Sequence, residues 1–441
     1  MPTMEIKGIS IDSRTIREGD LFIAIRGDRF DGHDFVAEAL KKGACGALVE
    51  RSMLEAKYAT LGGVANVVPV EDTVFALQEL AMMRRKKFFI PVVGITGSNG
   101  KTTTKEMLAS ILAKRGPVLK NEGNLNNHIG VPLTLFRLNS EHRSAVIEMG
   151  MSGLGEIEVL THIAMPTVGV ITNIGPAHLE FLRDTDTVAR AKAELLAGLR
   201  GDGTAVLNAD DRYYERLRAY FAGPLLSFGV NNPASVTAAD IRTGGEGTFF
   251  TLRFGDRSAP VLLRTLGTHN VSNALAAAAA AFAVGLSIDD VREGLEAFRP
   301  VAMRSELKEK RGVTIVADYY NANPASMQAA LEMLATLRKG TGRLIAVLGD
   351  MLELGETGPA RHREIGRNAA RLGIDHVITV GPLAEQIAAE AAASGMPKAR
   401  AVHAGTTGRA AELLRELAKP GDTVLIKGSR GMKMESILEA F

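Results

Sequence analysis

The segment GITGSNGKTTTKEML carries the residues of a phosphate-binding loop: Gly97, Gly100, Lys101 and Thr102. In such a loop, backbone N–H groups and the start of the next helix bind phosphate, the lysine reaches the β and γ phosphates, and the hydroxyl ligates magnesium. The usual spacing, G-x-x-x-x-G-K-[ST], puts a glycine where this chain has Ile95, and Gly97 supplies the flexible point instead. The order of strand, loop, lysine, threonine and helix predicts nucleotide binding. Kinases, switch proteins, motors and ligases all have this arrangement, so the loop alone does not identify the reaction.

Further polar residues follow later strands and helices of the same region: Glu148, His178, Lys192, Asn208 and Asp210. Singly, each has an ordinary explanation, because strand-end carboxylates, loop histidines and helical lysines usually face solvent. Ligands of an open parallel sheet gather at the carboxyl ends of its strands, so their joint recurrence favours one shared site. Magnesium accepts hydroxyl and carboxylate oxygens but not an ammonium group, and spacing alone does not explain the lysine.

Three blocks of sequence must position these side chains. Residues 1–86 mix short strands (LFIAI, GALVE, ANVVPV) with short helices, residues 87–299 alternate strands and helices around the loop, and residues 300–441 repeat that alternation. Continuous apolar strands between helices predict mainly parallel sheets covered on both faces. A Gly-rich stretch at 234–255 predicts antiparallel strands, and NALAAAAAAFAV predicts a closely packed helix. The predicted fold class is α/β in three domains: a small N-terminal domain, a central loop-bearing domain and a Rossmann-like C-terminal domain.

Composition narrows the class of protein. The chain has 441 residues, of which 46 % are hydrophobic and 23 % charged, as in globular proteins of several domains. It has no apolar run long enough to span a membrane and no secretory signal, and its single cysteine fits a reducing cytoplasm. The net charge is only +2, and the basic run at 84–87 is explained by a solvated helix end, so nucleic acid is not an expected partner.

Several motifs together resemble the Mur ligases of peptidoglycan synthesis: GITGSNGKTTTKEM, NEGNLNNHIGVPLTL, TNIGPAHLE, AKAEL, GTHNVSNALAAAA and ADYYNANPASM. The resemblance covers nearly the whole chain, including IDSR and GDLFIAIRGDRFDGHDFV near the start and LGDMLELG and VLIKGSRGMKME near the end. Among these ligases, the late motifs resemble the member that adds D-Ala-D-Ala to UDP-N-acetylmuramoyl-tripeptide. The resemblance implies a cytoplasmic, ATP-dependent ligase that activates the tripeptide carboxylate as an acyl phosphate. A monomer is the default expectation, since nothing in the sequence suggests an interface. Whether the third residue is lysine or diaminopimelate stays open.

The resemblance also implies roles for individual residues at the ATP and metal sites. Lys101, Glu148, His178 and Lys192 are the implied catalytic group, with Lys192 as a carbamate that helps to hold one of two magnesium ions. A lysine paired with a carboxylate is the alternative, and a helix N-cap is the alternative for Asn270. The implied ATP contacts are Gly97, Ser98, Asn99, Gly100, Lys101, Thr102, Thr103, Asn270, Asn273, Arg304 and Asp318, and the implied metal ligands are Thr102, Glu148, His178 and Lys192.

Two further groups are implied on the substrate side. The UDP-linked substrate would meet Asp12, Ser13, Arg14, Asp31, Gly32, His33, Asn126 and Asn127, and the dipeptide would meet Tyr320, Asn321 and Asn323. The sequence departs from the family pattern at three points: a short lead before IDSR, Tyr319 where serine is common, and Met303 where glycine often precedes the arginine.

Three alternative functions can be weighed on sequence. The ligase that adds the third residue shares the loop, but this chain has NANP where that ligase has Asp-Asn-Pro-Arg. Folylpolyglutamate synthetase lacks a DSR…DGHDF domain. A non-catalytic nucleotide switch would need the loop but not Glu148, His178 and Lys192 together.

Overall fold

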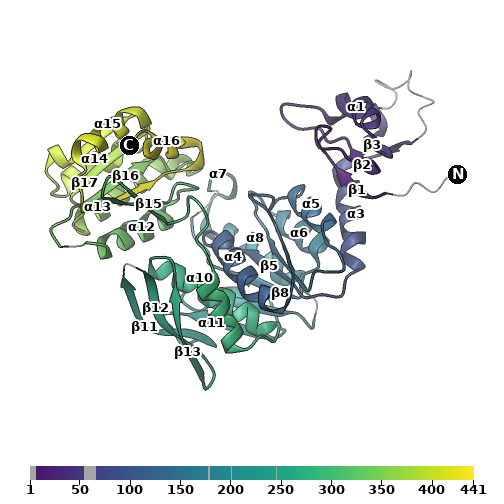
Figure 1. The fold of residues 1–441 in the computed structure, drawn as a ribbon, viewed down its shortest axis with the longest axis horizontal. Helices are drawn as coiled ribbons and strands as arrows, with labels where there is room; N and C mark the ends of the chain where they lie inside the picture. The colour runs from purple at the N-terminus through teal and green to yellow at the C-terminus, as the bar shows by residue number, and fades with distance from the viewer. Residues whose placement is uncertain (1–5, 54–65, 177–178, 200, 245, 339) are drawn as a thin grey trace.

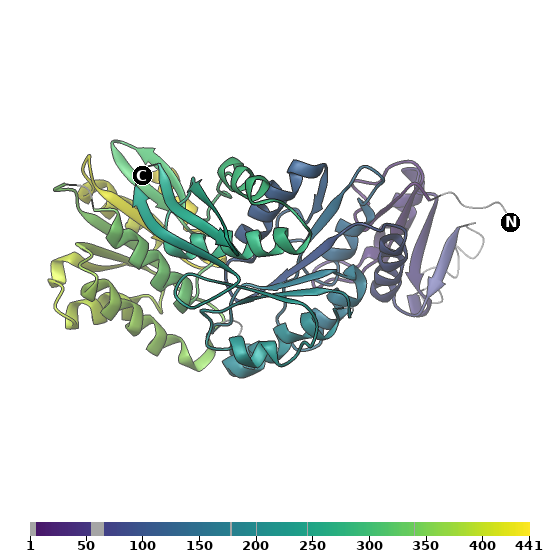
Figure 2. The same ribbon diagram turned by 90° about the horizontal axis from the view of Figure 1, so that it is seen from below.

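The structure is a computed structural model, and it describes the chain except residues 1–5, 54–65, 177–178, 200, 245 and 339. Three α/β domains follow one another along the longest axis, with the central domain between the other two (Figures 1 and 2). Each is built on its own sheet, as the sequence predicts.

The N-terminal domain holds four parallel strands in the order β1-β2-β3-β4. Their bounds are Gly8–Ser10, Asp20–Ile23, Gly46–Glu50 and Val67–Val70, and η1 (Gly32–Phe35) and α1 (Val36–Lys41) connect β2 to β3. The three predicted strands are confirmed, and a further strand before them, β1, has three residues.

Helix α3 (Thr73–Lys86) joins this domain to the next. The Asp72 carboxylate caps it by accepting from Phe75 N at 2.8 Å. Its Leu77 is buried between β2 residues and side chains of α5 (Gly130–Phe136), so α3 packs on both domains at once. The basic run forms its last turn, where positive charge favours the helix dipole.

The central sheet has nine strands in the order β13-β12-β11-β10-β9-β8-β5-β7-β6. Strands β5 (Val92–Thr96), β6 (Val118–Lys120), β7 (Ser144–Glu148), β8 (Val168–Ile171), β9 (Thr204–Asn208) and β10 (Leu225–Gly229) are parallel, and β11 (Val236–Gly244) continues them. The predicted antiparallel strands are confirmed as β11 and β12 (Gly247–Phe254), and β13 (Arg257–Leu263), which the sequence analysis did not separate, completes the edge.

Helices cover both faces of this sheet. One core cluster joins the strands to α4 (Lys101–Leu112), α10 (Thr268–Ala283) and α11 (Ile288–Ala297). The other joins them to α5, α6 (Glu156–Ala164), α8 (Thr185–Ala197) and α9 (Tyr214–Arg218), and α7 (Leu179–Leu182) lies before α8. The alanine-rich helix begins at Thr268, earlier than predicted, and its small buried side chains let it pack closely against α4.

The C-terminal sheet has the order β14-β15-β19-β16-β17-β18, with only the edge strand β14 antiparallel. Helices α12 to α14 cover one face and α15 and α16 the other, which confirms the Rossmann-like prediction. The strands are β14 (Glu306–Lys310), β15 (Val313–Ala317), β16 (Leu344–Gly349), β17 (His376–Val380), β18 (Ala401–Gly405) and β19 (Thr423–Lys427). The helices are α12 (Pro324–Thr336), α13 (Gly358–Arg371), α14 (Glu385–Ala393), α15 (Thr407–Leu417) and α16 (Glu435–Ala440).

Candidate active site

A cavity of about 640 Å³ opens where the central and C-terminal domains meet. Its walls come from the phosphate-binding loop, the ends of β7 and β8, the start of α10, the segment that follows β15, and the last residue of β19. Its volume is that of a cofactor-sized pocket. The lining residues that carry the following argument are Lys101, Thr102, Asn126, Glu148, Asn270, Asn273, Arg304, Asp318, Tyr320, Asn323 and Lys427.

The backbone of the loop explains where its glycines stand. Ile95 is fully buried in β5, so the turn starts later than in the usual pattern, at Gly97 with φ 151°. A Cβ on Gly97 would lie 1.9 Å from Thr172 Oγ1, and one on Gly100 (φ 81°) would lie 2.1 Å from Asn273 Oδ1. Both positions therefore require glycine, for conformation and for space.

Gly97→Ala should weaken ATP or ADP binding by about 2–3 kcal/mol, roughly 30- to 150-fold, because the added methyl must push Thr172 or the loop out of place. Titration calorimetry with ADP measures this. The matched control is Gly175→Ala in the same cavity, where the new Cβ would make only an ordinary 3.7 Å contact with Ser98. Equal affinity of Gly97→Ala and wild type would contradict the role given to this turn.

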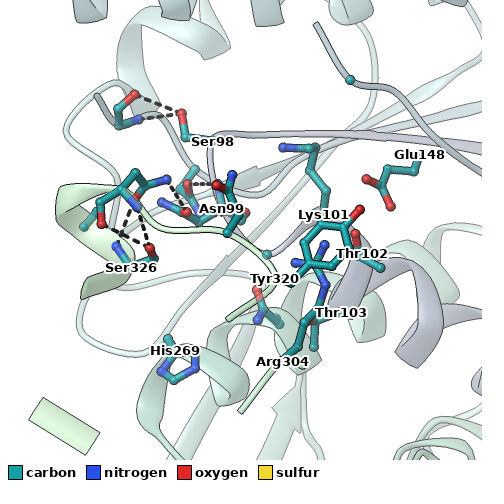
Figure 3. A pocket seen from close by; sticks show the side chains of 18 of the residues that line it. Ser98, Asn99, Lys101, Thr102, Thr103, Glu148, His269, Arg304, Tyr320 and Ser326 are labelled. Carbon is teal, nitrogen blue, oxygen red and sulfur yellow. Dashed lines mark hydrogen bonds between the residues drawn. The ribbon is translucent and has the colours of Figure 1, made fainter. Parts of the chain in front are cut away.

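Lys101 and Thr102 begin α4 at the floor of the cavity, with the Glu148 carboxylate beside them (Figure 3). The Lys101 ammonium donates to the Gly97 carbonyl at 2.7 Å. Burial lowers the pKa of Lys101, the Glu148 carboxylate opposes that shift, and Arg304 adds to it. The lysine is thus folded back on its own loop, at a position from which its charge can meet a phosphate.

Glu148 is the carboxylate of this site, at the end of β7. One oxygen, Oε1, accepts from Asn126 Nδ2 at 2.8 Å, and the Glu148 N–H donates to Asn121 Oδ1 at 2.7 Å. The other oxygen, Oε2, is buried without a hydrogen bond and lies 3.7 Å from the buried Lys105 ammonium. A buried carboxylate oxygen that lacks a hydrogen-bond donor suits a cation, so Thr102 and Glu148 fit magnesium.

The described part of the chain contains no cluster of three or more histidine, cysteine or acidic side chains that could hold a metal. Magnesium does not require such a cluster, since it is usually bound by one or two protein oxygens, water and substrate phosphates. His178, the other implied ligand, lies outside the described residues.

Lys192 is buried on α8, with 2 % of its surface exposed. Its amine has no hydrogen bond or ion pair to any residue that the structure describes, so the salt-bridged alternative is not seen there. Burial lowers the pKa of Lys192 well below its usual value, and the charge of Lys101 lowers it further. A neutral, unpartnered amine is the form that combines with carbon dioxide.

The C-terminal domain contributes a partly buried ion pair. Asp318 follows β15 and Lys427 ends the neighbouring strand β19, and their Oδ2 and Nζ atoms are 2.7 Å apart. Asp318 Oδ1 also accepts from the Ser305 N–H at 3.1 Å. These contacts hold the Asp318 carboxylate at the cavity wall.

Arg304 reaches the cavity from the linker between the domains. Its guanidinium lies 3.9 Å from the centre of the Tyr320 ring, and its Nε is buried without a hydrogen bond. Tyr320, an implied dipeptide contact, therefore also positions this arginine. The neighbours Met303 and Ser305 have φ of 64° and 50°, in the left-handed region that favours glycine.

Two asparagine side chains near the start of α10 are joined by a hydrogen bond. Asn270 Nδ2 donates to Leu266 O at 2.8 Å and to Thr265 Oγ1 at 3.1 Å, and Asn273 Nδ2 donates to Asn270 Oδ1 at 3.1 Å. The N-cap is Gly267, so the N-cap alternative for Asn270 is wrong. Its neighbour His269 also lines the cavity, and burial lowers the pKa of that histidine.

The residues implied for the UDP-linked substrate fall into two places. Asn126 and Asn127 line the cavity, whereas those of the N-terminal domain do not. There the Arg14 guanidinium, bonded to the Asp12 carboxylate at 2.6 Å, lowers the pKa of Asp12 to about 2. The buried His33 ring is bonded to Asp31 Oδ1 at 2.6 Å and accepts from Glu50 N at 3.0 Å, so it holds the turn together.

Asn208 and Asp210, grouped with the site on sequence, do not line the cavity. Asn208 Nδ2 donates to Thr172 O at 3.0 Å. The Asp210 carboxylate accepts from Val230 N at 2.6 Å and from the next two backbone N–H groups, and so closes the loop between β10 and β11.

Asp210→Ala should lower the free energy of unfolding of the central domain by about 1 kcal/mol, because three partly or fully exposed backbone N–H groups lose a charged acceptor. Urea denaturation measures this loss, and the turnover number at 25 °C should stay that of the wild type. A large fall in turnover with unchanged stability would instead return Asp210 to the active site.

Sequence reasoning missed several residues of this site: Lys105, Asn121, Thr172, Asn173, Ser305 and Lys427. Two of them carried a usable signal. Lys105 stands four residues after Lys101 on one helix and therefore on the same side, and Lys427 ends an apolar strand as Glu148 does.

No helix in the described residues has the length and apolar character to cross a membrane.

Three family models match the chain in order. The model described as "Mur ligase family, catalytic domain" matches residues 5–85, the Mur ligase middle domain matches 95–281, and "Mur ligase, glutamate ligase domain" matches 303–430. A relative from Bacillus subtilis (strain 168), UDP-N-acetylmuramoyl-tripeptide–D-alanyl-D-alanine ligase, is 38 % identical over 98 % of this chain and 93 % of its own.

Two solved structures are similar over the whole chain. The MurF structure from Acinetobacter baumannii has a TM-score of 0.90 at 36 % identity and covers 100 % of this chain and 94 % of its own. The MurF ligase from Thermotoga maritima in complex with ADP has a TM-score of 0.89 at 32 % identity, with coverage of 100 % and 98 %.

Proposed function

Because this chain belongs to the Mur ligase family, we propose that it joins D-alanyl-D-alanine to the tripeptide carboxylate of UDP-N-acetylmuramoyl-tripeptide, with ATP converted to ADP and phosphate. The observation that carries the proposal is the cavity in which a phosphate-binding loop faces a carboxylate oxygen without a donor and an arginine from a second domain. A nucleotide switch has no use for this set of groups.

The chemistry follows from the weakness of a carboxylate as an electrophile. A tripeptide carboxylate oxygen attacks the γ phosphorus, the bond to ADP breaks, and an acyl phosphate forms. The dipeptide amine then adds to the carbonyl carbon, loses a proton, and phosphate leaves as the amide forms. The protein's main tasks are to position the reactants and to neutralise charge on the phosphoryl group.

Each group of residues has one task in this scheme. Lys101 neutralises charge on the transferring phosphoryl group, and the loop backbone from Gly97 to Thr103 cradles the phosphates. Asn270, Asn273, Arg304 and Asp318 hold the nucleotide. Thr102, Glu148, His178 and carbamylated Lys192 hold two magnesium ions, which when bound neutralise phosphate charge.

Each of the three domains binds a different substrate or part of one. Residues 1–86 bind the UDP part, through Asp12, Ser13, Arg14, Asp31 and Gly32, with His33 supporting their turn. Residues 87–299 bind ATP and, through Asn126 and Asn127, the muropeptide. Residues 300–441 close over ATP and bind the dipeptide through Tyr320 and Asn321. The enzyme acts as a monomer in the cytoplasm, where ATP and UDP-linked precursors are found.

The test is phosphate release from purified protein with ATP and magnesium. UDP-N-acetylmuramoyl-tripeptides ending in lysine or diaminopimelate, and D-Ala-D-Ala, are added singly and together. Release that needs both partners supports the proposal and identifies the preferred third residue. Release that needs UDP-N-acetylmuramoyl-dipeptide and a free diamino acid would assign the chain to the third-residue ligase, and release indifferent to muropeptides would exclude both.

A further inference from the structure

Asn323 was expected on the dipeptide side, but its amide is already occupied. It is the N-cap of α12, where its Oδ1 accepts from Ser326 N at 2.9 Å and its own N–H donates to Ser326 Oγ at 3.0 Å. Its Nδ2 donates to Asn99 Oδ1 at 2.7 Å, across the domain boundary. Figure 3 shows these contacts between the Ser326 turn and Asn99. The residue is 8 % exposed, so little of it is left for a ligand.

Asn99, the partner, belongs to the phosphate-binding loop, and its backbone is held from the other side. The Asn99 N–H donates to Asn173 Oδ1 at 2.9 Å, and its carbonyl accepts from Thr172 Oγ1 at 2.5 Å and from Asn173 Nδ2 at 3.1 Å. Thr172 is also the residue that leaves no room for a side chain at Gly97. Movement of the Asn99 side chain would therefore move the backbone of the loop between Gly97 and Gly100.

This contact is the one hydrogen bond that joins residues 87–299 to residues 300–441 within the described parts of both. Charge interactions also cross this boundary, between Lys101 and Arg304 and between His269 and Asp318, and apolar contacts accompany them. Leu266 is buried in the C-terminal core cluster, and η3 (Gly355–Thr357) lies against α7. A hydrogen bond weakens steeply when its distance or angle changes. The bond between Asn323 and Asn99 therefore forms only when the C-terminal domain lies in the right position against the loop.

We infer that Asn99 and Asn323 are positioning residues that form a latch: the C-terminal domain, when docked, holds the phosphate-binding loop in its catalytic shape through this hydrogen bond. Acyl phosphate formation is thereby tied to the closed arrangement, in which water is kept from the intermediate. The inference rests on the proposed function, and it assigns to Asn323 a role other than contact with the dipeptide.

Asn323→Ser tests the latch without removing the cap. Serine is a good N-cap residue, introduces no charge and is too short to reach Asn99. We expect the turnover number to fall about tenfold, the KM for the UDP-linked substrate to stay unchanged, and phosphate released per amide formed to rise above one. In an Asn99→Ala background the same substitution should have no further effect, because the partner is already gone. Ser326→Thr, which keeps the hydroxyl that accepts from the Asn323 N–H and leaves the contact with Asn99 in place, is the matched control and should behave as wild type.

Two results would overturn the inference. An equal fall in turnover caused by Asn323→Ser in both backgrounds would mean that Asn323 does not act through Asn99. A rise in the KM for D-Ala-D-Ala alone would restore its dipeptide role.

A scattering measurement separates failure of the latch from failure of the proposed function. If the wild type releases no phosphate with these substrates, the function is wrong, yet small-angle X-ray scattering with ADP still tests the latch. Asn323→Ser should then be more extended than wild type, and identical radii of gyration would refute the latch.

Discussion

Lys192→Met should reduce amide formation by roughly a thousandfold, about 4 kcal/mol of transition-state stabilisation. Methionine has a similar length but cannot carry a carbamate, so the site loses the anionic, oxygen-bearing group that the proposed modification of Lys192 would supply. The fold should not suffer, because the change removes a buried amine that has no partner in the described structure. Steady-state phosphate release and thermal unfolding measure the two effects. Arg190→Met, at an exposed position of the same helix, is the control.

The activity that depends on Lys192 should fall as the pH is lowered. The pKa of Lys192 is lowered, so the neutral amine that combines with carbon dioxide is present above that lowered pKa and is lost as the pH falls through it. At a fixed concentration of dissolved carbon dioxide, activity should therefore fall on the acid side, and removing carbon dioxide should reduce it at every pH. Full activity of carbon-dioxide-free enzyme, with no added mass on Lys192, would rule out the carbamate.

Glu148→Gln should lower kcat/KM by a few hundredfold, about 3.5 kcal/mol, because an amide nitrogen replaces the oxygen that lacks a donor. The neutral side chain also leaves the buried Lys105 without the carboxylate at 3.7 Å. Calorimetry should show that magnesium no longer strengthens ADP binding, a readout that does not depend on turnover.

Glu106→Gln is the matched control for that change. Glu106 also contacts Lys105, at 3.3 Å, but it does not line the cavity. Its replacement should leave both turnover and the magnesium effect near wild type. If the two glutamine variants behaved alike, Glu148 would act by neutralising Lys105 rather than by binding metal.

Local patterns predicted most of the fold. Apolar strands separated by helical segments identified three α/β domains, and the Gly-rich stretch at 234–255 identified the antiparallel strands that extend the central sheet. Where boundaries were wrong, packing decided them. α10 begins at Thr268, with Gly267 (φ 93°) as its N-cap, and its early residues His269 and Asn270 line the cavity.

The sequence by itself determined the loop, the helix that follows it, and the strand ends that carry Glu148 and Asp318. These depend on residue order within a few positions, which local sterics and hydrogen bonding encode. Only the tertiary structure decided which polar residues contact each other. It places the Asp210 carboxylate on the loop after β10, buries His33, sets Lys105 beside Glu148 and bonds Asn323 to Asn99. Such pairings depend on how helices, strands and domains pack against each other, which local spacing does not encode. Asn99 and Asn323, for example, are 224 positions apart.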